Sequence, residues 1–187
     1  MNHTPARQPC TSPRLRPIIT AAEIERRVAE LGGQICNDYA GCDDLVIIAV
    51  MRGAIFFLVD LLRQLDRPLR LDIVHAASYR GAATTGSVQM LQPVTIDIRG
   101  SDVLVIDDIL DTGLTLRRVL DHLAACRPRT LRTCVLLSKN VPRQAEVTAD
   151  YIGFEIADQF VVGYGLDYND RYRHLPYIAA VETDDAG

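Results

Sequence analysis

The segment from Val103 to Leu116 reads Val-Leu-Val-Ile-Asp-Asp-Ile-Leu-Asp-Thr-Gly-Leu-Thr-Leu and joins two kinds of apolar pattern. Its first four residues form a continuous Val/Ile/Leu run, which is typical of a strand buried on both faces of a parallel sheet. From Leu114 onward the apolar residues recur at helical spacing, at Leu116, Val119 and Leu123. The polar turn between them therefore joins the carboxyl end of a strand to the start of a helix, where open α/β sheets bind ligands.

This turn has the composition of a phosphate-binding site. A helix start presents free backbone N–H groups to an anion, and Gly113 allows a ligand to approach the backbone closely. Thr112 and Thr115 add hydroxyl donors. The Gly-Lys-Ser/Thr ending of a P-loop is absent, so backbone amides and the two threonines would form the cradle.

Three acids near the turn need a separate explanation, because a carboxylate beside a phosphate repels it. Asp107 and Asp108 are expected to face hydroxyl groups or a metal-bound sugar, and Asp111 to project toward the group beside that sugar. The alternative is that the acids only cap the helix, which Asp and Thr do well. A cap needs one such residue, whereas three acids and two threonines occur within nine positions here, so a binding role is favoured.

The stretch from Asp107 to Thr115 resembles the motif with which type I phosphoribosyltransferases bind phosphoribosyl diphosphate (PRPP). In that family two acids meet the ribose hydroxyls, and the following turn holds the 5′-phosphate. A variant of the motif also occurs in PRPP synthetases, so the motif does not settle the reaction by itself.

The bulk properties are those of one compact globular domain. The chain has 187 residues, of which 48% are apolar and 24% charged. A formal net charge of −4 argues against a broad nucleic-acid-binding face, and no apolar run has the length that crosses a bilayer. The cysteines are odd in number and form no CxxC pair, which indicates reduced thiols in a cytoplasmic protein: Cys10, Cys36, Cys42, Cys126 and Cys134.

Residues 1–17 differ from the rest of the chain, because they contain four of the nine prolines, three arginines and no acid. The lack of an apolar core excludes a secretory signal, and proline at every fourth position prevents the amphipathic helix of a transit peptide. We expect a disordered tail, followed by a single domain over residues 18–187.

Beyond the tail, buried apolar runs alternate with helical spacing. Thr20-Ala-Ala-Glu23 matches a capping box. The expected helices cover 21–39, 56–65 and 114–125, and the expected strands cover 44–50, 71–78, 92–98 and 131–137. This alternation predicts an α/β fold with a mostly parallel, doubly wound sheet and helices on both faces. Short apolar runs predict a small irregular hood, built mainly from 151–181.

Further motifs resemble the hypoxanthine-guanine phosphoribosyltransferases, which are type I enzymes of purine salvage. The matching stretches are Met51-Arg52-Gly53, Ser78-Tyr79, Ser138-Lys139, Gly153 to Ile156, and Phe160 to Asn169 with Arg173. The similarity runs from about Ile18 to Val181 in the family's order. Taken alone, Arg52, Lys139 and Phe160 would be interpreted as a surface arginine, a solvated lysine and a core residue.

The resemblance implies roles for residues on the purine side. Phe160 would stack on the purine, and Val161 would offer backbone groups to its edge. Lys139 would hydrogen-bond the 6-oxygen, which favours a 6-oxopurine over adenine. Asp111 would face ring nitrogen 7 as the catalytic residue. Asp167 is assigned to the purine site and would also help to hold Mg²⁺.

The resemblance also implies the site for the phosphoribosyl group. Asp107 and Asp108 would meet the ribose hydroxyls and, with Asp167, hold Mg²⁺. The turn Asp111-Thr112-Gly113-Leu114-Thr115 would bind the 5′-phosphate. Leu114 stands where some relatives have lysine or asparagine, so no side-chain donor is expected at that position.

The diphosphate would be bound by Arg173 and by Met51-Arg52-Gly53, where the resemblance implies that the Met51–Arg52 peptide bond can be cis. Ser78 and Tyr79 would begin a mobile catalytic lid that extends to Gln89.

The expected reaction is Mg²⁺-dependent transfer of 5-phosphoribosyl from PRPP to hypoxanthine or guanine, which gives IMP or GMP and diphosphate. The expected partners are these small molecules, without nucleic acid or membrane, and the resemblance implies a homodimer or homotetramer. Two alternatives remain. An RNA-binding regulator on the same fold, as in the pyrimidine attenuation proteins, needs a basic face, and PRPP synthetases are much longer chains.

Overall fold

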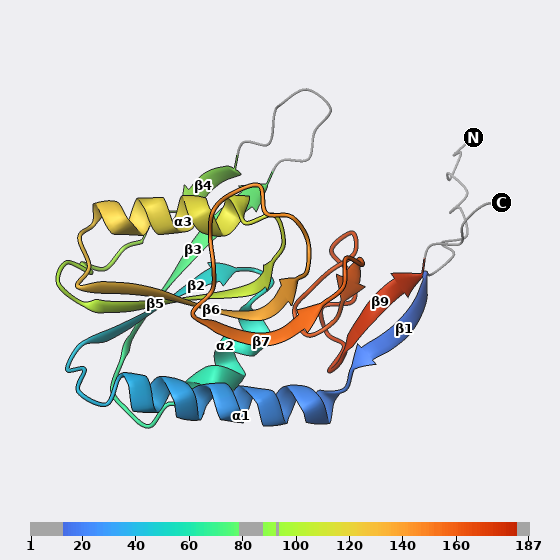
Figure 1. The fold of residues 1–187 in the computed structure, drawn as a ribbon, viewed down its shortest axis with the longest axis horizontal. Helices are drawn as coiled ribbons and strands as arrows, with labels where there is room; N and C mark the ends of the chain where they lie inside the picture. The colour runs from blue at the N-terminus through green and yellow to red at the C-terminus, as the bar shows by residue number, and fades with distance from the viewer. Residues whose placement is uncertain (1–12, 79–87, 93, 183–187) are drawn as a thin grey trace, which may run out of the picture.

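The computed structural model describes residues 13–78, 88–92 and 94–182, which form a large sheet, a small sheet and three helices (Figure 1). The large sheet has the order β4-β3-β2-β5-β6-β7; β4 is antiparallel to β3, and all other neighbours are parallel. Its strands are β2 (Leu45–Met51), β3 (Arg70–Ser78), β4 (Val88–Gln92), β5 (Asp102–Leu110), β6 (Thr130–Lys139) and β7 (Tyr151–Ile156). The helices are α1 (Ala21–Asp38), α2 (Ile55–Leu62) and α3 (Leu114–Ala125).

Helices cover both faces of this sheet, which confirms the predicted α/β fold. Helices α1 and α2 lie on one face and α3 on the other (Figure 1). In β2, Ile47 and Ala49 belong to the core beneath α1 and α2, while Val46 and Ile48 belong to the core beneath α3. This alternation follows from the two-residue period of a strand, and it explains why the central strands are apolar throughout.

The predicted capping box begins α1. The Thr20 hydroxyl oxygen accepts the Glu23 N–H at 3.3 Å, and the Glu23 carboxylate accepts the Thr20 N–H at 2.8 Å. These two bonds satisfy donors that a helix start otherwise leaves free.

The hood is a three-stranded antiparallel sheet of order β1-β9-β8, formed by β1 (Arg14–Ile19), β8 (Val161–Val162) and β9 (Ile178–Glu182). The prediction of a tail up to residue 17 is wrong for 14–17, because this segment pairs with β9 and Pro17 lies opposite Ala179. An edge strand tolerates a proline that a central strand excludes. Residues 1–12 lie outside the described part of the chain.

Two further assignments need correction. The segment Tyr151–Ile156 was expected in the hood but forms the edge strand β7 of the large sheet, parallel to β6. The strand expected over 92–98 is instead β4, which ends at Gln92, and residues 94–98 form no strand. There the Asp72 carboxylate accepts the Ile96 N–H at 3.2 Å, so a side chain replaces the neighbouring strand as the hydrogen-bond partner.

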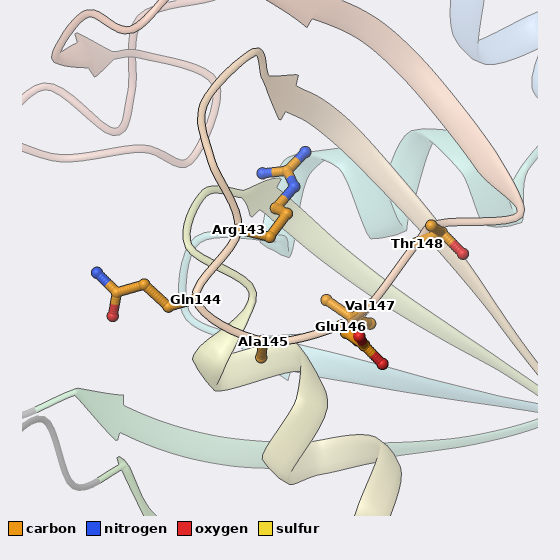
Figure 2. A pocket seen from close by; sticks show the side chains of 6 residues that line it. All are labelled: Arg143, Gln144, Ala145, Glu146, Val147 and Thr148. Atoms are coloured by element: carbon orange, nitrogen blue, oxygen red, sulfur yellow. The ribbon is translucent and has the colours of Figure 1, made fainter.

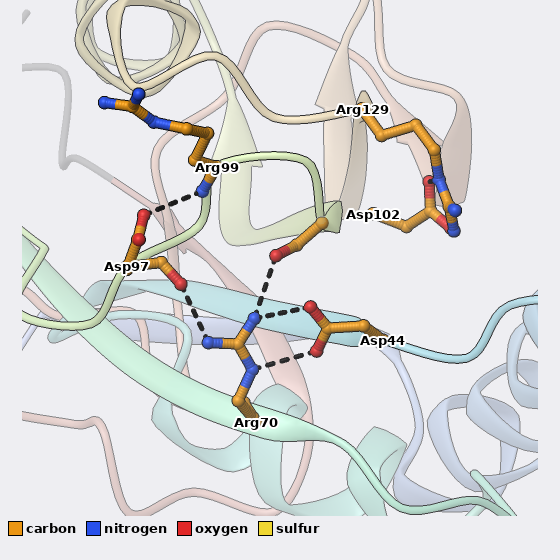
Figure 3. A network of polar contacts seen from close by, with 7 residues as sticks. Asp44, Arg70, Asp97, Arg99, Asp102 and Arg129 are labelled. Atoms are coloured by element: carbon orange, nitrogen blue, oxygen red, sulfur yellow. Dashed lines mark hydrogen bonds and ion pairs between the residues drawn. The ribbon is translucent and has the colours of Figure 1, made fainter.

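Charged side chains tie together the starts of the parallel strands (Figure 3). The Arg70 guanidinium donates to both carboxylate oxygens of Asp44, at 2.9 and 2.6 Å. Arg129 donates to Asp102, which also accepts the Thr130 hydroxyl at 2.8 Å. The hydrogen bonds from Arg129 hold the pKa of Asp102 well below its usual range. The network therefore stabilises the end of the large sheet at which its parallel strands begin, opposite their carboxyl ends.

Across the described ranges, none of the helices combines the length and the apolar character that crossing a membrane requires.

Candidate active site

The carboxyl ends of β2, β5 and β6 bring their following turns to one edge of the sheet, because the three strands are parallel neighbours. After β2, the Met51–Arg52 peptide bond is cis, as the resemblance implied. A Cβ atom on Gly53 would collide with the Asp108 carboxylate. The turn after β2 and the acidic end of β5 are therefore in direct contact and form one site.

The two adjacent acids are held in place by short local hydrogen bonds. Asp107 accepts the Asp108 N–H at 2.9 Å, and Asp108 accepts the Ile109 N–H at 2.9 Å. Burial, with a further contribution from the Asp108 carboxylate, raises the pKa of Asp107 well above its usual value. Burial also raises the pKa of Asp108. Carboxyl oxygens held in this way at the end of a strand can accept hydrogen bonds from the hydroxyl groups of a sugar.

The predicted phosphate turn leads directly into α3. Gly113 is the N-cap, with a φ of +84°, and no side chain makes a cap hydrogen bond. The alternative in which the acids cap this helix is therefore wrong. A Cβ on Gly113 would lie 2.7 Å from the Val147 side chain, so glycine is required both by the backbone conformation and by the close packing.

Lys139 ends β6 beside Asp111. Its side chain is only 11% exposed, and its Nζ lies 3.3 Å from Asp111 Oδ2 and 3.2 Å from Asp158 Oδ1. The interpretation of Lys139 as a solvated surface lysine is therefore wrong. An ammonium next to a carboxylate can donate to a carbonyl oxygen while the acid accepts from a nitrogen of the same planar ring.

Phe160 precedes β8 and presents an exposed ring. The residue is 46% exposed, and the ring packs edge-on against Tyr168 with centroids 5.6 Å apart, so it is not a core residue. The backbone beneath it is fixed, because the Phe160 carbonyl accepts the Val181 N–H at 2.8 Å and the neighbouring Val161 is buried opposite Ala180. A fixed aromatic face of this kind can stack on a planar ligand.

The loop after β8 meets the turn after β2. A Cβ on Gly165 would collide with the Gly53 carbonyl oxygen. Arg173 donates to the Gly165 carbonyl at 2.6 Å and pairs with Asp167 at 2.6 Å. Arg52 is exposed and lies 3.4 Å from Asp170, which is also 3.7 Å from Arg173. The two arginines predicted to bind diphosphate thus both lie next to the Asp170 carboxylate.

The three acids predicted to hold Mg²⁺ supply the oxygen ligands that this ion prefers. Among the described residues, however, no three His, Cys, Asp or Glu side chains gather closely enough to hold a metal by themselves, and Asp167 is already paired with Arg173. The described residues thus offer oxygen donors of the kind that Mg²⁺ prefers, without forming a closed set of ligands.

The structure describes little of the two predicted lid residues, and it brings three residues to the site that the sequence did not predict. Tyr79 is outside the described residues, and Ser78 is described only as the last residue of β3. Three residues near the site do not stand out in the sequence: Asp158, Asp170 and Arg143. Of these, Arg143 contacts the Asp111 backbone. Asp170 could have been suspected from its place three residues after Asp167, whereas the other two stand in loops that carry no periodic pattern.

Residues 18–169 match the family described as phosphoribosyl transferase domain. A hypoxanthine phosphoribosyltransferase from Salmonella typhimurium is 43% identical over 166 residues, which cover 88% of this chain and 93% of that protein. The chain belongs to the hypoxanthine phosphoribosyltransferase family. This family also accounts for the fold. A crystal structure of a hypoxanthine-guanine phosphoribosyltransferase from Bacillus anthracis aligns with a TM-score of 0.83 at 37% identity, covering 91% of this chain and 99% of that one.

A Trypanosoma cruzi hypoxanthine phosphoribosyltransferase variant, described as a ternary substrates complex, also aligns with a TM-score of 0.83 at 37% identity. The alignment covers 91% of this chain and 96% of that one.

Proposed function

We propose that this chain is a purine-salvage enzyme that transfers 5-phosphoribosyl from PRPP to hypoxanthine or guanine and releases diphosphate. The observation that carries the proposal is the Asp111–Lys139 pair at 3.3 Å, which stands directly beside the turn suited to a phosphate. Lys139 would donate to the 6-oxygen, and Asp111 would accept the proton that the ring sheds as it becomes a nucleotide. Phe160 would stack on the ring, and Val161 would present its backbone to the ring edge.

The remaining residues would act on PRPP. Breaking the bond at ribose carbon 1 leaves positive charge on the sugar and negative charge on the departing diphosphate. Arg52, Arg173 and the backbone of Met51 and Gly53 would stabilise the diphosphate. Mg²⁺ would supply charge neutralisation on the same group.

The acids and the phosphate turn would hold the rest of the substrate. Asp107 and Asp108 would orient the ribose hydroxyls, and together with Asp167 they would ligate Mg²⁺ brought by the substrate. The 5′-phosphate would lie on the amides of residues 111–115 and on the Thr112 and Thr115 hydroxyls.

An assay of PRPP and Mg²⁺ with hypoxanthine, guanine, xanthine or adenine tests this function. We expect diphosphate release that depends on hypoxanthine or guanine, with adenine a much poorer substrate because its 6-amino group cannot accept from Lys139. A preference for adenine, or the absence of purine-dependent PRPP consumption, would contradict the proposal. An RNA-binding regulator would instead show salt-dependent RNA binding without this turnover.

We further propose a cytoplasmic homodimer or homotetramer. Large apolar side chains on the outer side of α2 support assembly, because Ile55, Phe56 and Val59 are 41–43% exposed and a second copy would bury them. Sedimentation velocity of the purified chain would give the oligomeric state.

A further inference from the structure

The connector, which we define as residues 140–150 between β6 and β7, packs against the phosphate turn. The backbone N–H groups of Gln144 and Ala145 donate to the Thr112 carbonyl, at 2.9 and 3.3 Å. The Val147 side chain fills the space that a Cβ on Gly113 would need. The connector therefore holds the turn by two backbone hydrogen bonds and by the packing of Val147 against Gly113.

One side chain of the connector makes a different set of contacts. The Arg143 guanidinium donates through one nitrogen to the carbonyls of Leu110, at 2.8 Å, and Asp111. Its other terminal nitrogen donates to the Ser138 hydroxyl at 2.9 Å. The Arg143 and Gln144 side chains leave the connector in different directions (Figure 2), and Arg143 is the one that contacts the ends of β5 and β6.

These contacts join two neighbouring strands, β5 and β6, at residues that lie opposite each other. Leu110 in β5 and Ser138 in β6 are register partners. Asp111 follows the first of them and Lys139 follows the second, so the guanidinium is anchored one residue before each member of the 3.3 Å pair. A shift of either strand end would change the distance between the Asp111 carboxylate and the Lys139 ammonium.

We propose that Arg143 is a positioning residue that sets the Asp111–Lys139 geometry and thereby the binding of a 6-oxopurine. This inference rests on the proposed function. A planar guanidinium can donate to acceptors on two strands at once, whereas an ammonium is a single point charge on a flexible stem. The phosphate side of the site does not depend on this side chain, because backbone amides of the connector hold Thr112.

The test compares Arg143→Met and Arg143→Lys with Arg117→Met as a matched control. Arg117 contacts the same connector, by donating to the Glu146 carbonyl at 3.4 Å, but touches no atom of the purine site. For R143M, kcat/KM for hypoxanthine should fall by about 100-fold, the effect expected when reacting groups are displaced by about 1 Å, and KM for hypoxanthine should rise as part of this loss. KM for PRPP should stay within about twofold of wild type because the amides remain. R143K should lose nearly as much as R143M, and R117M should resemble wild type.

The pattern of the two Michaelis constants separates positioning from a general loss of structure. A reduced fraction of folded enzyme lowers the apparent kcat and leaves both constants unchanged, and a displaced connector raises both. Either of these results overturns the proposal, as does full activity of R143K, which would show that charge alone is needed. If wild type shows no purine-dependent turnover, the proposed function itself fails, and the comparison of variants does not arise.

Discussion

Replacing Gly165 with alanine tests whether the hood fixes the turn expected to bind diphosphate. Gly165 has a φ of +104°, which L side chains rarely adopt, and its Cβ would collide with the Gly53 carbonyl oxygen. The backbone conformation alone costs roughly 1–2 kcal/mol for a residue with a Cβ. The collision adds to this cost, because the opposing atom belongs to the backbone and cannot rotate away as a side chain can.

Gly100 provides the matched control. Its φ is +73°, and nothing lies within 4 Å of an added Cβ. Gly100→Ala therefore carries the conformational cost alone: its free energy of unfolding should fall by about 1–2 kcal/mol, with kinetics unchanged. Gly165→Ala should lose more stability than this. Because the Gly53 backbone must move by about 1 Å, kcat/KM for PRPP should also fall by about 100-fold.

Urea unfolding gives the first quantity, and initial rates at saturating hypoxanthine with varied PRPP give the second. If both variants lose equal stability and keep wild-type PRPP kinetics, the reasoning is refuted, because the hood can then yield without displacing the turn after β2.

Three further changes test other parts of the structure. Asp111→Asn removes a proton acceptor while keeping the shape of the side chain, so kcat should fall by about 10²–10⁴-fold; turnover close to wild type would exclude Asp111 as the base. Thr115→Ala should raise KM for PRPP several-fold, since a hydrogen bond to a charged group is worth about 1.5–3 kcal/mol, while Leu114→Ala should barely change it; equal effects would mean that the cradle atoms are misassigned. Asp102→Asn should lower the free energy of unfolding at pH 7 by about 1.5 kcal/mol. Because folding depresses the pKa of Asp102, the difference in free energy of unfolding between wild type and this variant should shrink as pH falls below about 4. If urea unfolding gives the same difference down to pH 3, the result would count against the network.

The large sheet could be predicted because each of its central strands is a run of consecutive apolar residues in the sequence. In β2 and β5 the apolar runs are continuous, since helices cover both faces of the sheet. The hood could not be predicted in the same way. Short apolar runs indicated β8 and β9, but β1 is ordered by pairing with β9 at the far end of the chain, so no local pattern marks β1 as a strand.

The residues of the site also fall into those that the sequence predicts and those that it does not. Asp107 and Asp108 lie near the carboxyl end of an apolar strand, where open α/β sheets bind ligands, so the strand pattern alone placed them in a site. Lys139 ends β6, but its place in the site was implied only by the family resemblance. The contacts of Asp158 and Arg143 depend on the paths of loops, which composition does not encode. The two ion pairs of Lys139 could not be read from the sequence either, because Asp111 and Asp158 are distant from it along the chain.

The pairing of β1 with β9 also governs the order in which the molecule can be completed during synthesis. All the strands of the large sheet, and therefore the turn for the 5′-phosphate, precede β8 along the chain. The Phe160 backbone is fixed only when β9 has emerged, because the Val181 N–H donates to the Phe160 carbonyl. A growing chain thus assembles the turn for the 5′-phosphate and the acids for the ribose first, whereas Arg173, which is expected to bind diphosphate, follows β8. The aromatic platform for the base is fixed last, so a nascent chain acquires the contacts for the 5′-phosphate and the ribose before it has the ring that stacks on the base.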